Sequence, residues 1–278
     1  MQRISMAMSP HPSTFAPLVF AGNLEEGMKA LAEAGFSGVE ISLCSVDDLD
    51  ADWLADRLSE FDLKLSAVAS GRVCLEESLC LCDPHPAIRE MALERLTSIL
   101  KLAARFKAPV IIGGIRGKLI GEDTEKAEQR ENTVKSLRRC AVIAADLGTH
   151  LLLEPINRYE TNFINNAQDG LRLIEDIGHP GVKLLLDTFH MNIEEADPCA
   201  TIRKVGSRLG YMHFADNNRL APGQGHIDFP ALLRALAEIG YSGFISAEIL
   251  PIPDDATALK QTGQYLHSLI SEIAGPLS

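Results

Sequence analysis

The sequence predicts an α/β protein folded as a single (β/α)8 barrel, the TIM barrel architecture, over residues 1–278. Eight short apolar runs alternate with longer amphipathic segments, and apolar runs of this length are typical of buried strands. Their spacing of about 25 to 45 residues suits a strand, a loop and a helix in each unit. The runs begin near Ile4, Val39, Leu65, Val110, Leu151, Val182, Gly210 and Phe244.

The chain is also uninterrupted. No linker rich in Pro, Gly or Ser and no block of charge divides it, which favours one domain. An open doubly wound sheet would need a phosphate-binding glycine fingerprint after its first strand, and none is there. Residues 32–38 resemble residues 237–243, and both segments span a helix end, a glycine turn and a strand start. Equivalent units of this kind favour the closed barrel.

The segments between the runs have the periodicity of helices. Their apolar residues recur three or four positions apart, as one face of a helix requires. Such positions include Leu96, Ile99, Leu100 and Ala103, then Leu137, Ala141 and Ala144, then Leu171, Ile174 and Ile177. Glycine follows several of these segments and supplies the left-handed conformation that ends a helix.

Composition and charge exclude several classes of function. The apolar fraction of 46% and the charged fraction of 23% are ordinary for a soluble globular protein. A net charge of −12 repels polyanions and argues against a nucleic-acid or anionic-membrane surface. Without a signal peptide or a run of roughly 18 apolar residues, we expect no membrane segment and a cytoplasmic location. The six cysteines form no disulfide framework, which predicts reduced thiols.

Four consecutive predicted strands end on residue types that commonly bind metals. The fifth run ends at Glu154, the sixth at Asp187, the seventh at His213 and the eighth at Glu248. In a parallel barrel all strands end on the same face, and neighbouring strands lie about 4.8 Å apart. We therefore expect an active site at the carboxyl ends of strands five to eight, where the four side chains converge.

The chemistry of this set indicates a divalent cation. Three carboxylates held together would repel one another, and a cation removes that penalty. Three oxygen ligands and one imidazole suit a fairly hard ion, with Mn²⁺ as the first choice and Mg²⁺ or Co²⁺ as alternatives. Because no thiolate belongs to the set, a structural zinc site is disfavoured.

Three segments resemble a known family. Residues 154–160 (Glu-Pro-Ile-Asn-Arg-Tyr-Glu), 186–195 and 213–219 are similar to the xylose isomerase-like barrel superfamily, and within it to the D-tagatose and D-psicose 3-epimerase group. The resemblance is dense over roughly residues 150 to 250 and looser before them. It implies metal binding by the four strand-end residues, and homo-oligomers, either dimers or tetramers. It also implies contacts to a sugar from the residues Glu160, His190 and Arg219.

The resemblance implies a metal-dependent ketose 3-epimerase acting on free ketohexoses or ketopentoses through an enediolate. Epimerisation needs one group to remove a proton and another to return a proton on the opposite face. Glu154 and Glu248, on strands five and eight, are our candidates for this acid/base pair. The acidic, proline-rich segment 251–255 favours a free sugar over a sugar phosphate, because phosphates on barrel substrates often bind near loops seven and eight.

Other functions use a similar frame. An aldose–ketose isomerase, a hydroxypyruvate-type isomerase or an inosose-type dehydratase needs the same cation and carboxylates. An abasic-site endonuclease with three zinc ions would use a pair such as His226 and Asp228, but strands two to four end without histidine and the net charge opposes DNA. A non-catalytic sugar-binding protein is the alternative from another class.

Several polar residues are ambiguous in the sequence. Glu40 lies inside the second run, and the alternation of the strand decides whether it points into the barrel. Arg116, in a glycine-rich segment after the fourth run, is expected as an exposed arginine on a flexible loop, and contact with an anionic group of a substrate is the alternative. Asn157 and Arg158 are expected to shape their loop, and a loop salt bridge between Arg158 and Glu160 is the alternative to sugar binding by Glu160.

Overall fold

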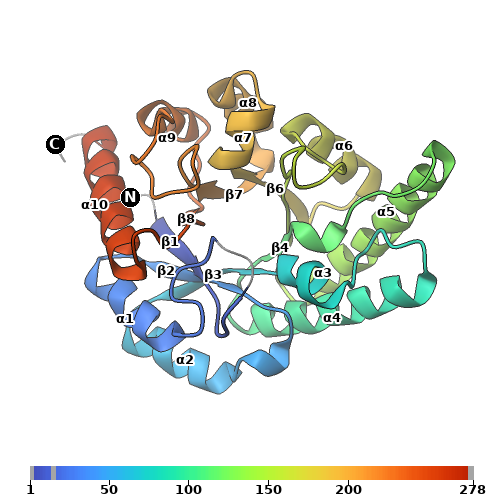
Figure 1. Ribbon diagram of the computed structural model, residues 1–278, viewed down its shortest axis with the longest axis horizontal. Coiled ribbons are helices and arrows are strands. Elements are labelled where there is room, and N and C mark those ends of the chain that lie inside the picture. Colours follow the sequence, from blue (N-terminus) through green and yellow to red (C-terminus); the bar gives the residue numbers. More distant parts are fainter. Residues whose placement is uncertain (1–2, 14–16, 275–278) are drawn as a thin grey trace.

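The computed structural model describes residues 3–13 and 17–274 and shows a closed barrel of parallel strands surrounded by helices (Figure 1). The strands are β1 (Arg3–Met8), β2 (Gly38–Ser42), β3 (Lys64–Ala69), β4 (Val110–Ile112), β5 (Leu151–Leu153), β6 (Val182–Asp187), β7 (Leu209–Phe214) and β8 (Phe244–Ala247). Each strand pairs with its neighbours in chain order, and β8 pairs with β1 to close the ring. The predicted (β/α)8 fold and all eight predicted strands are confirmed.

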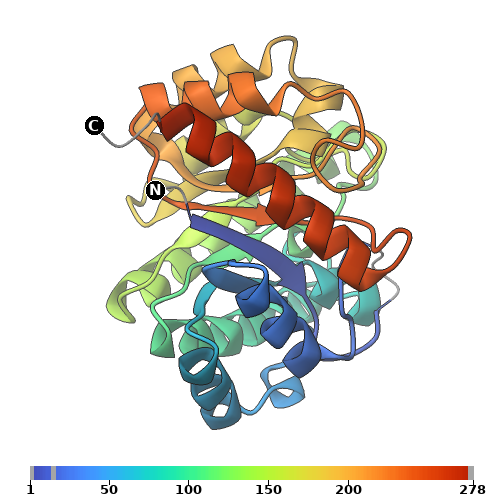
Figure 2. The same cartoon turned by 90° about the vertical axis from the view of Figure 1, so that its left-hand side faces the viewer.

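Helices connect the strands and cover the outside of the barrel. They are α1 (Leu24–Glu33), α2 (Ala51–Glu60), α3 (Gly71–Glu77), α4 (Pro86–Arg105), α5 (Asp123–Asp146), α6 (Ala167–Ile177), α7 (Thr188–Glu194), α8 (Pro198–Val205), α9 (Phe229–Glu238) and α10 (Asp255–Ala274). Short 3-10 turns are η1 (Val46–Asp48), η2 (Gly114–Arg116) and η3 (Gly206–Arg208). Figure 2 shows α10 lying across the junction of β1 and β8. The apolar positions predicted for α4, from Leu96 to Ala103, are buried against the strands.

Strand alternation decides which side chains enter the barrel. Tyr211 on β7 donates a hydrogen bond to Ser66 on β3 (2.7 Å), and these strands are not neighbours, so the bond crosses the interior. His213 lies two residues further along the same strand and therefore faces the same way. Leu152 and Leu185 belong to an interior apolar cluster with Tyr211. Glu154 and Asp187 each follow one of these leucines by two residues, so they too face the interior. The strand-end residues thus form the layer above the interior apolar cluster.

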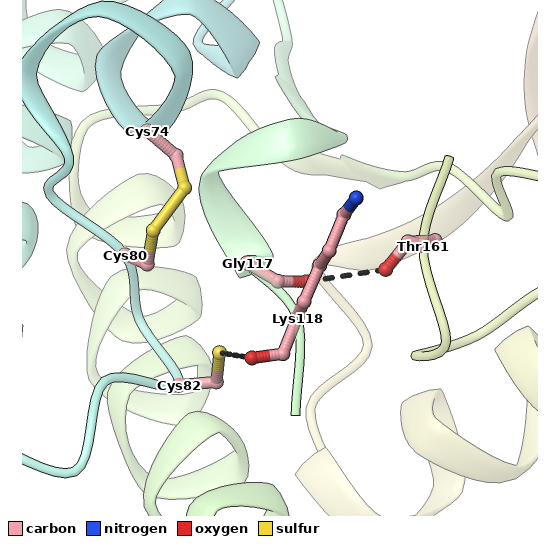
Figure 3. Close-up of a disulfide and its surroundings, with 6 residues drawn as sticks. All are labelled: Cys74, Cys80, Cys82, Gly117, Lys118 and Thr161. Atoms are coloured by element: carbon pink, nitrogen blue, oxygen red, sulfur yellow. Dashed lines mark hydrogen bonds between the residues drawn. A yellow bond between two sulfur atoms is a disulfide. The ribbon is translucent and has the colours of Figure 1, made fainter. Parts of the chain in front are cut away.

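A disulfide joins Cys74 in α3 to Cys80 in the connection to α4 (Figure 3). The prediction of reduced thiols is therefore wrong for these two cysteines, whereas Cys44, Cys82, Cys140 and Cys199 are free. The physical reason is a turn that the cysteine spacing does not reveal. Ser78 ends α3 with a left-handed conformation (φ 57°), which reverses the chain and brings the two Cα atoms to 5.1 Å.

Within the described ranges 3–13 and 17–274, no helix combines the length and the apolar character needed to cross a membrane.

Candidate metal centre

The four strand-end residues meet at one point. Glu154 follows β5 directly, Asp187 ends β6, His213 lies near the end of β7 and Glu248 follows β8. All four are buried, and one ligand-type atom from each lies within 4.8 Å of the others. The short apolar strands explain this convergence, because each places one polar side chain at the same depth and on the same face of the barrel.

His213 is the side chain whose hydrogen bonds define the centre. Its Nε2 is 2.9 Å from Oε2 of Glu40, and a carboxylate accepts, so Nε2 carries a hydrogen. Its Nδ1 is 3.5 Å from Glu154 Oε1, 3.7 Å from Asp187 Oδ2 and 3.6 Å from Glu248 Oε2. Nδ1 is buried and has no hydrogen-bond partner among the described residues. An imidazole that gives one N–H to a carboxylate and turns its other nitrogen toward three carboxylates fits a metal ligand.

Glu40 therefore points into the barrel, the direction that the sequence left open. Its side chain is fully buried and reaches His213 from β2 across the interior. The signal in the sequence was a carboxylate within an otherwise apolar run, between Val39 and Ile41. Although burial opposes it, the charges of Glu40 and Glu248 raise the pKa of His213 well above its usual value.

Arg219 lies inside the same cluster. Its guanidinium forms ion pairs with Asp187 and Glu248, and it stands over the ring of Phe189 at 4.9 Å from the ring centroid. Asp187 is buried, yet the charge of Arg219 lowers its pKa below the usual range. Burial raises the pKa of Glu248 to about 8. The carboxylates of this centre thus require positive charge, which the arginine supplies here and a divalent cation could also supply.

Asp216 shapes the loop that carries Arg219. Its carboxylate accepts hydrogen bonds from the backbone N–H groups of Asn217, Gly223, Gly225 and Ile227, at 2.8–3.2 Å. This network folds the loop after β7 back on itself and fixes the left-handed backbone of Arg219 (φ 62°). Because Arg219 also accepts a backbone hydrogen bond from Leu250 (2.8 Å), the loops after β7 and β8 are tied together at the centre.

His190 and Glu160 lie beside the centre and are joined by Asn157. Asn157 Nδ2 is 2.7 Å from Glu160 Oε1 and 2.8 Å from His190 Nδ1. His190 is buried in α7, and burial lowers its pKa, whereas the side chain of Glu160 is 51% exposed. Arg158 pairs with Glu194 (2.8 Å) rather than with Glu160, so the alternative of an Arg158–Glu160 salt bridge is wrong. Among the predicted site residues, Glu160 is thus the exposed one, and it lies at the outer edge of the site.

Arg116 is buried, and the prediction of an exposed arginine on a flexible loop is wrong. Its guanidinium donates to the carbonyl oxygens of Glu154 (2.6 Å), Ile112 (3.1 Å) and Phe163 (3.0 and 3.3 Å). Burial lowers the pKa of Arg116 to about 10. Carbonyl oxygens from the end of β4 and from the segment after β5 compensate the buried charge, and a sequence does not show where such carbonyls will lie.

The glycine-rich turn around Arg116 also fits closely against the centre. A Cβ atom on Gly113 would lie 2.4 Å from Glu154 Oε2, so the absence of a side chain leaves room for the carboxylate. The other end of the turn meets the disulfide region, where Cys82 Sγ donates to Lys118 O and Thr161 Oγ1 donates to Gly117 O (Figure 3). Three residues that support the centre were not assigned to it from the sequence. They are Arg116, Glu40 and Asn157.

Comparisons with known proteins agree with this geometry. The family model described as a xylose isomerase-like TIM barrel matches residues 28–268. An L-ribulose 3-epimerase from Methylomonas sp. (strain DH-1) is 32% identical over 231 residues, which cover 82% of this chain and 79% of the relative. A 3-dehydro-D-guloside 4-epimerase from Escherichia coli (strain K12) is 38% identical over 238 residues, 82% of this chain and 88% of the relative. A solved structure of L-ribulose 3-epimerase superposes over 100% of both chains with 27% identity and a TM-score of 0.84.

Proposed function

Because this chain belongs to the xylose isomerase-like TIM barrel family, we propose that it is a metal-dependent ketose 3-epimerase acting on free ketohexoses or ketopentoses. The observation that carries the proposal is the convergence of three carboxylates and one unpartnered imidazole nitrogen at the carboxyl ends of β5 to β8. Curated relatives named L-ribulose 3-epimerase and D-psicose 3-epimerase support the reaction class.

Glu154, Asp187, His213 and Glu248 would hold one divalent cation. Mn²⁺ is our first choice and Mg²⁺ or Co²⁺ are alternatives, because the set offers carboxylate oxygens and an imidazole but no thiolate. When bound, the cation supplies a Lewis acid that acidifies the C–H next to the ketone and balances charge on the substrate oxygens. Glu40 holds the imidazole of His213 in the orientation that turns Nδ1 toward this position.

Glu154 and Glu248 are the acid/base pair of the proposal. They extend from β5 and β8, so the two intervening strands separate their backbones, and both carboxylates reach the same centre. One of them, as a carboxylate, takes the proton from the carbon beside the ketone, and the other, as a carboxylic acid, gives its proton to the opposite face. One proton leaves and one arrives, so the configuration inverts without change in composition.

His190, Arg219 and Glu160 are assigned to the sugar. His190 and Arg219 lie at the centre and offer donors to the ketone and hydroxyl oxygens, while the carboxylate of Glu160 at the rim accepts from a hydroxyl group. A homo-oligomer, either a dimer or a tetramer, is the assembly that the family resemblance implies. Light scattering on the purified protein tests it.

A second candidate reaction follows from one relative. The Escherichia coli protein is named as a 4-epimerase of a 3-dehydro glycoside, and it is 38% identical over 88% of its own length. In both reactions the inverted carbon is adjacent to a ketone, so the same two carboxylates and the same cation would serve. The two candidates differ in the substrate that the site accepts, a free ketose or a glycoside.

Deuterium exchange separates these functions. The Mn²⁺-loaded protein is incubated in D₂O with D-fructose, D-tagatose, L-ribulose and a 3-dehydro glycoside, and the sugars are analysed by NMR after chelation of the metal. Deuterium at C3 of a ketose supports the proposal, whereas deuterium at C1 or C2 indicates an isomerase and deuterium at C4 of the glycoside indicates the second candidate. Exchange with none of them would contradict an epimerase acting on these classes.

Two variants test the acid/base pair. Glu154→Gln and Glu248→Gln should each reduce exchange at C3 by at least about 10²-fold, because general acid–base catalysis contributes about 10²–10⁴-fold. Glu131→Gln is the matched control, since Glu131 pairs with Lys135 on the outer surface of α5. Exchange at the wild-type rate in both site variants would refute the assignment.

A further inference from the structure

We propose that Asn157 sets the tautomer of His190, so that His190 keeps its hydrogen on Nε2 and presents Nε2–H to the substrate. Asn157 is then a positioning residue, which acts through His190. The tautomer follows from hydrogen bonds of this chain alone. The role of Nε2–H as a donor to a sugar oxygen rests on the proposed function.

The orientation of the Asn157 amide is fixed by two partners of unambiguous polarity. Its Oδ1 lies 3.0 Å from the backbone nitrogen of Tyr159, which can only donate. On the other side, its Nδ2 lies 2.7 Å from Oε1 of Glu160, and an ionised carboxylate can only accept. If the amide oxygen and nitrogen were exchanged, the NH₂ group would face the N–H of Tyr159, and the amide oxygen would face the carboxylate of Glu160. Neither contact would be a hydrogen bond. The NH₂ group therefore faces Glu160 and His190.

The second hydrogen of this NH₂ group determines the protonation of the imidazole. Nδ2 of Asn157 is 2.8 Å from Nδ1 of His190, and an amide nitrogen has no lone pair available to accept. Nδ1 must accept, so it carries no hydrogen. In a neutral imidazole the hydrogen then lies on Nε2.

The surroundings of the pair protect this arrangement. Asn157 is 1% exposed and His190 is 6% exposed, so water has little access to the bond between them. The nearest carboxylate oxygen to Nδ1 is Oε1 of Glu160 at 4.0 Å, beyond hydrogen-bond distance, and it already accepts from Asn157. Because Nδ1 already accepts a hydrogen bond from Asn157, Nε2 is the ring nitrogen that can bind another partner.

Nε2 is available to a ligand. Among residues 3–13 and 17–274, no hydrogen bond to His190 Nε2 is formed. His190 lies in the first turn of α7, three residues after Asp187, which places it at the carboxyl end of β6 beside the strand-end cluster. A neutral Nε2–H donates to a ketone or hydroxyl oxygen, whereas the opposite tautomer would present a lone pair and could only accept. Asn157 therefore selects the donor form.

The tautomer can be measured without substrate. Protein labelled with ¹⁵N-histidine and loaded with diamagnetic Mg²⁺ is studied by long-range ¹H–¹⁵N NMR at neutral pH, and His190→Gln identifies the signals of His190. We expect a bare nitrogen at Nδ1 and a protonated nitrogen at Nε2. A signal from the opposite tautomer, or from an imidazolium with both nitrogens protonated, would overturn the proposal.

Asn157→Asp tests the cause. The aspartate keeps the shape but can only accept, so we expect Nδ1 of His190 to gain a hydrogen, by tautomer exchange or by protonation. Asn165→Asp is the matched control, because Asn165 lies in the same loop and donates to the carbonyls of Ile156 and Thr161 (both 2.8 Å) without contacting His190. The control should leave the tautomer unchanged. An unchanged tautomer in Asn157→Asp would overturn the proposal, even if activity fell.

Kinetics provides a separate measurement. Loss of one positioned donor costs about 10²–10³-fold in kcat, so Asn157→Asp should lower kcat by this factor on a substrate that the deuterium-exchange experiment identifies. In a His190→Gln background the same substitution should change kcat by less than about threefold, because both changes remove the same donor. If the effects of Asn157→Asp and His190→Gln on kcat were additive, Asn157 would not act through His190 and the proposal would be overturned. If no sugar is turned over, the proposed function fails, while the tautomer measurement still decides the assignment.

Discussion

Arg116 provides the sharpest test of how the centre is supported. Its guanidinium connects the turn after β4 to the carbonyls of Glu154 and Phe163, which both lie in the segment after β5. Arg116→Met removes these donors and keeps a side chain of similar length. We expect the free energy of unfolding to fall by about 2–4 kcal/mol and the affinity for Mn²⁺ to fall as well, because the backbone of Glu154 loses its anchor.

The magnitude follows from the bonds that are lost. The carbonyl of Ile112 also accepts from the backbone N–H of Glu154 (3.1 Å) and so keeps a donor. The carbonyls of Glu154 and Phe163 each lose a charged donor, and a hydrogen bond to a charged group contributes about 1.5–3 kcal/mol. Removing a buried charge offsets part of this loss, since burial already lowers the pKa of Arg116 to about 10.

Urea unfolding followed by circular dichroism measures the change in stability, and calorimetric titration with Mn²⁺ measures the affinity. Arg116→Lys is the informative companion, because it keeps the charge but concentrates its donors on one atom, which cannot reach all three carbonyls. We expect it to lose nearly as much stability as Arg116→Met. An Arg116→Met protein within about 0.5 kcal/mol of the wild type, a difference typical of surface substitutions, would refute the reasoning.

Three further predictions follow from other contacts. Gly113→Ala should lower kcat by about 10²-fold, because the new Cβ displaces the Glu154 carboxylate and misplacement by about 1 Å has that effect; activity within threefold of the wild type would contradict this. Glu40→Gln keeps an oxygen that accepts from His213 Nε2 but loses the negative charge, so the imidazole becomes a weaker ligand and Mn²⁺ binding should weaken by about 10–100-fold, as measured by calorimetry; unchanged affinity would argue against it. Arg72 and Glu76 form an ion pair within α3 (2.7 Å), and the guanidinium of Arg72 lowers the pKa of Glu76 from its usual 4.5 to about 2. The stability that the ionised Glu76 contributes is therefore complete above pH 4.5 and is lost as the pH falls toward 2. The stability difference between the wild type and Glu76→Gln, measured by urea unfolding, should therefore shrink over that range, and a constant difference would contradict the assignment.

The fold was predictable because its signals are local. Each strand shows itself as a short apolar run, each helix as a periodic segment, and the closed barrel follows from eight such units without a linker. The convergence of Glu154, Asp187, His213 and Glu248 was predictable for a related reason. All parallel strands end on one face, so four polar strand ends in succession must lie near one another.

The contacts that support the centre were decided only by the tertiary structure. Arg116 is buried because carbonyls from the loop after β5 fold over it, and the disulfide of Cys74 exists because a left-handed residue turns the chain. Glu40 meets His213 across the barrel, 173 positions along the chain. Residue spacing shows which side chains share a strand face, but the partner of a polar group depends on loop paths and on distances across the barrel. The sequence by itself therefore determined the barrel and its four polar strand ends, and only the folded chain determined which buried groups hold them in place.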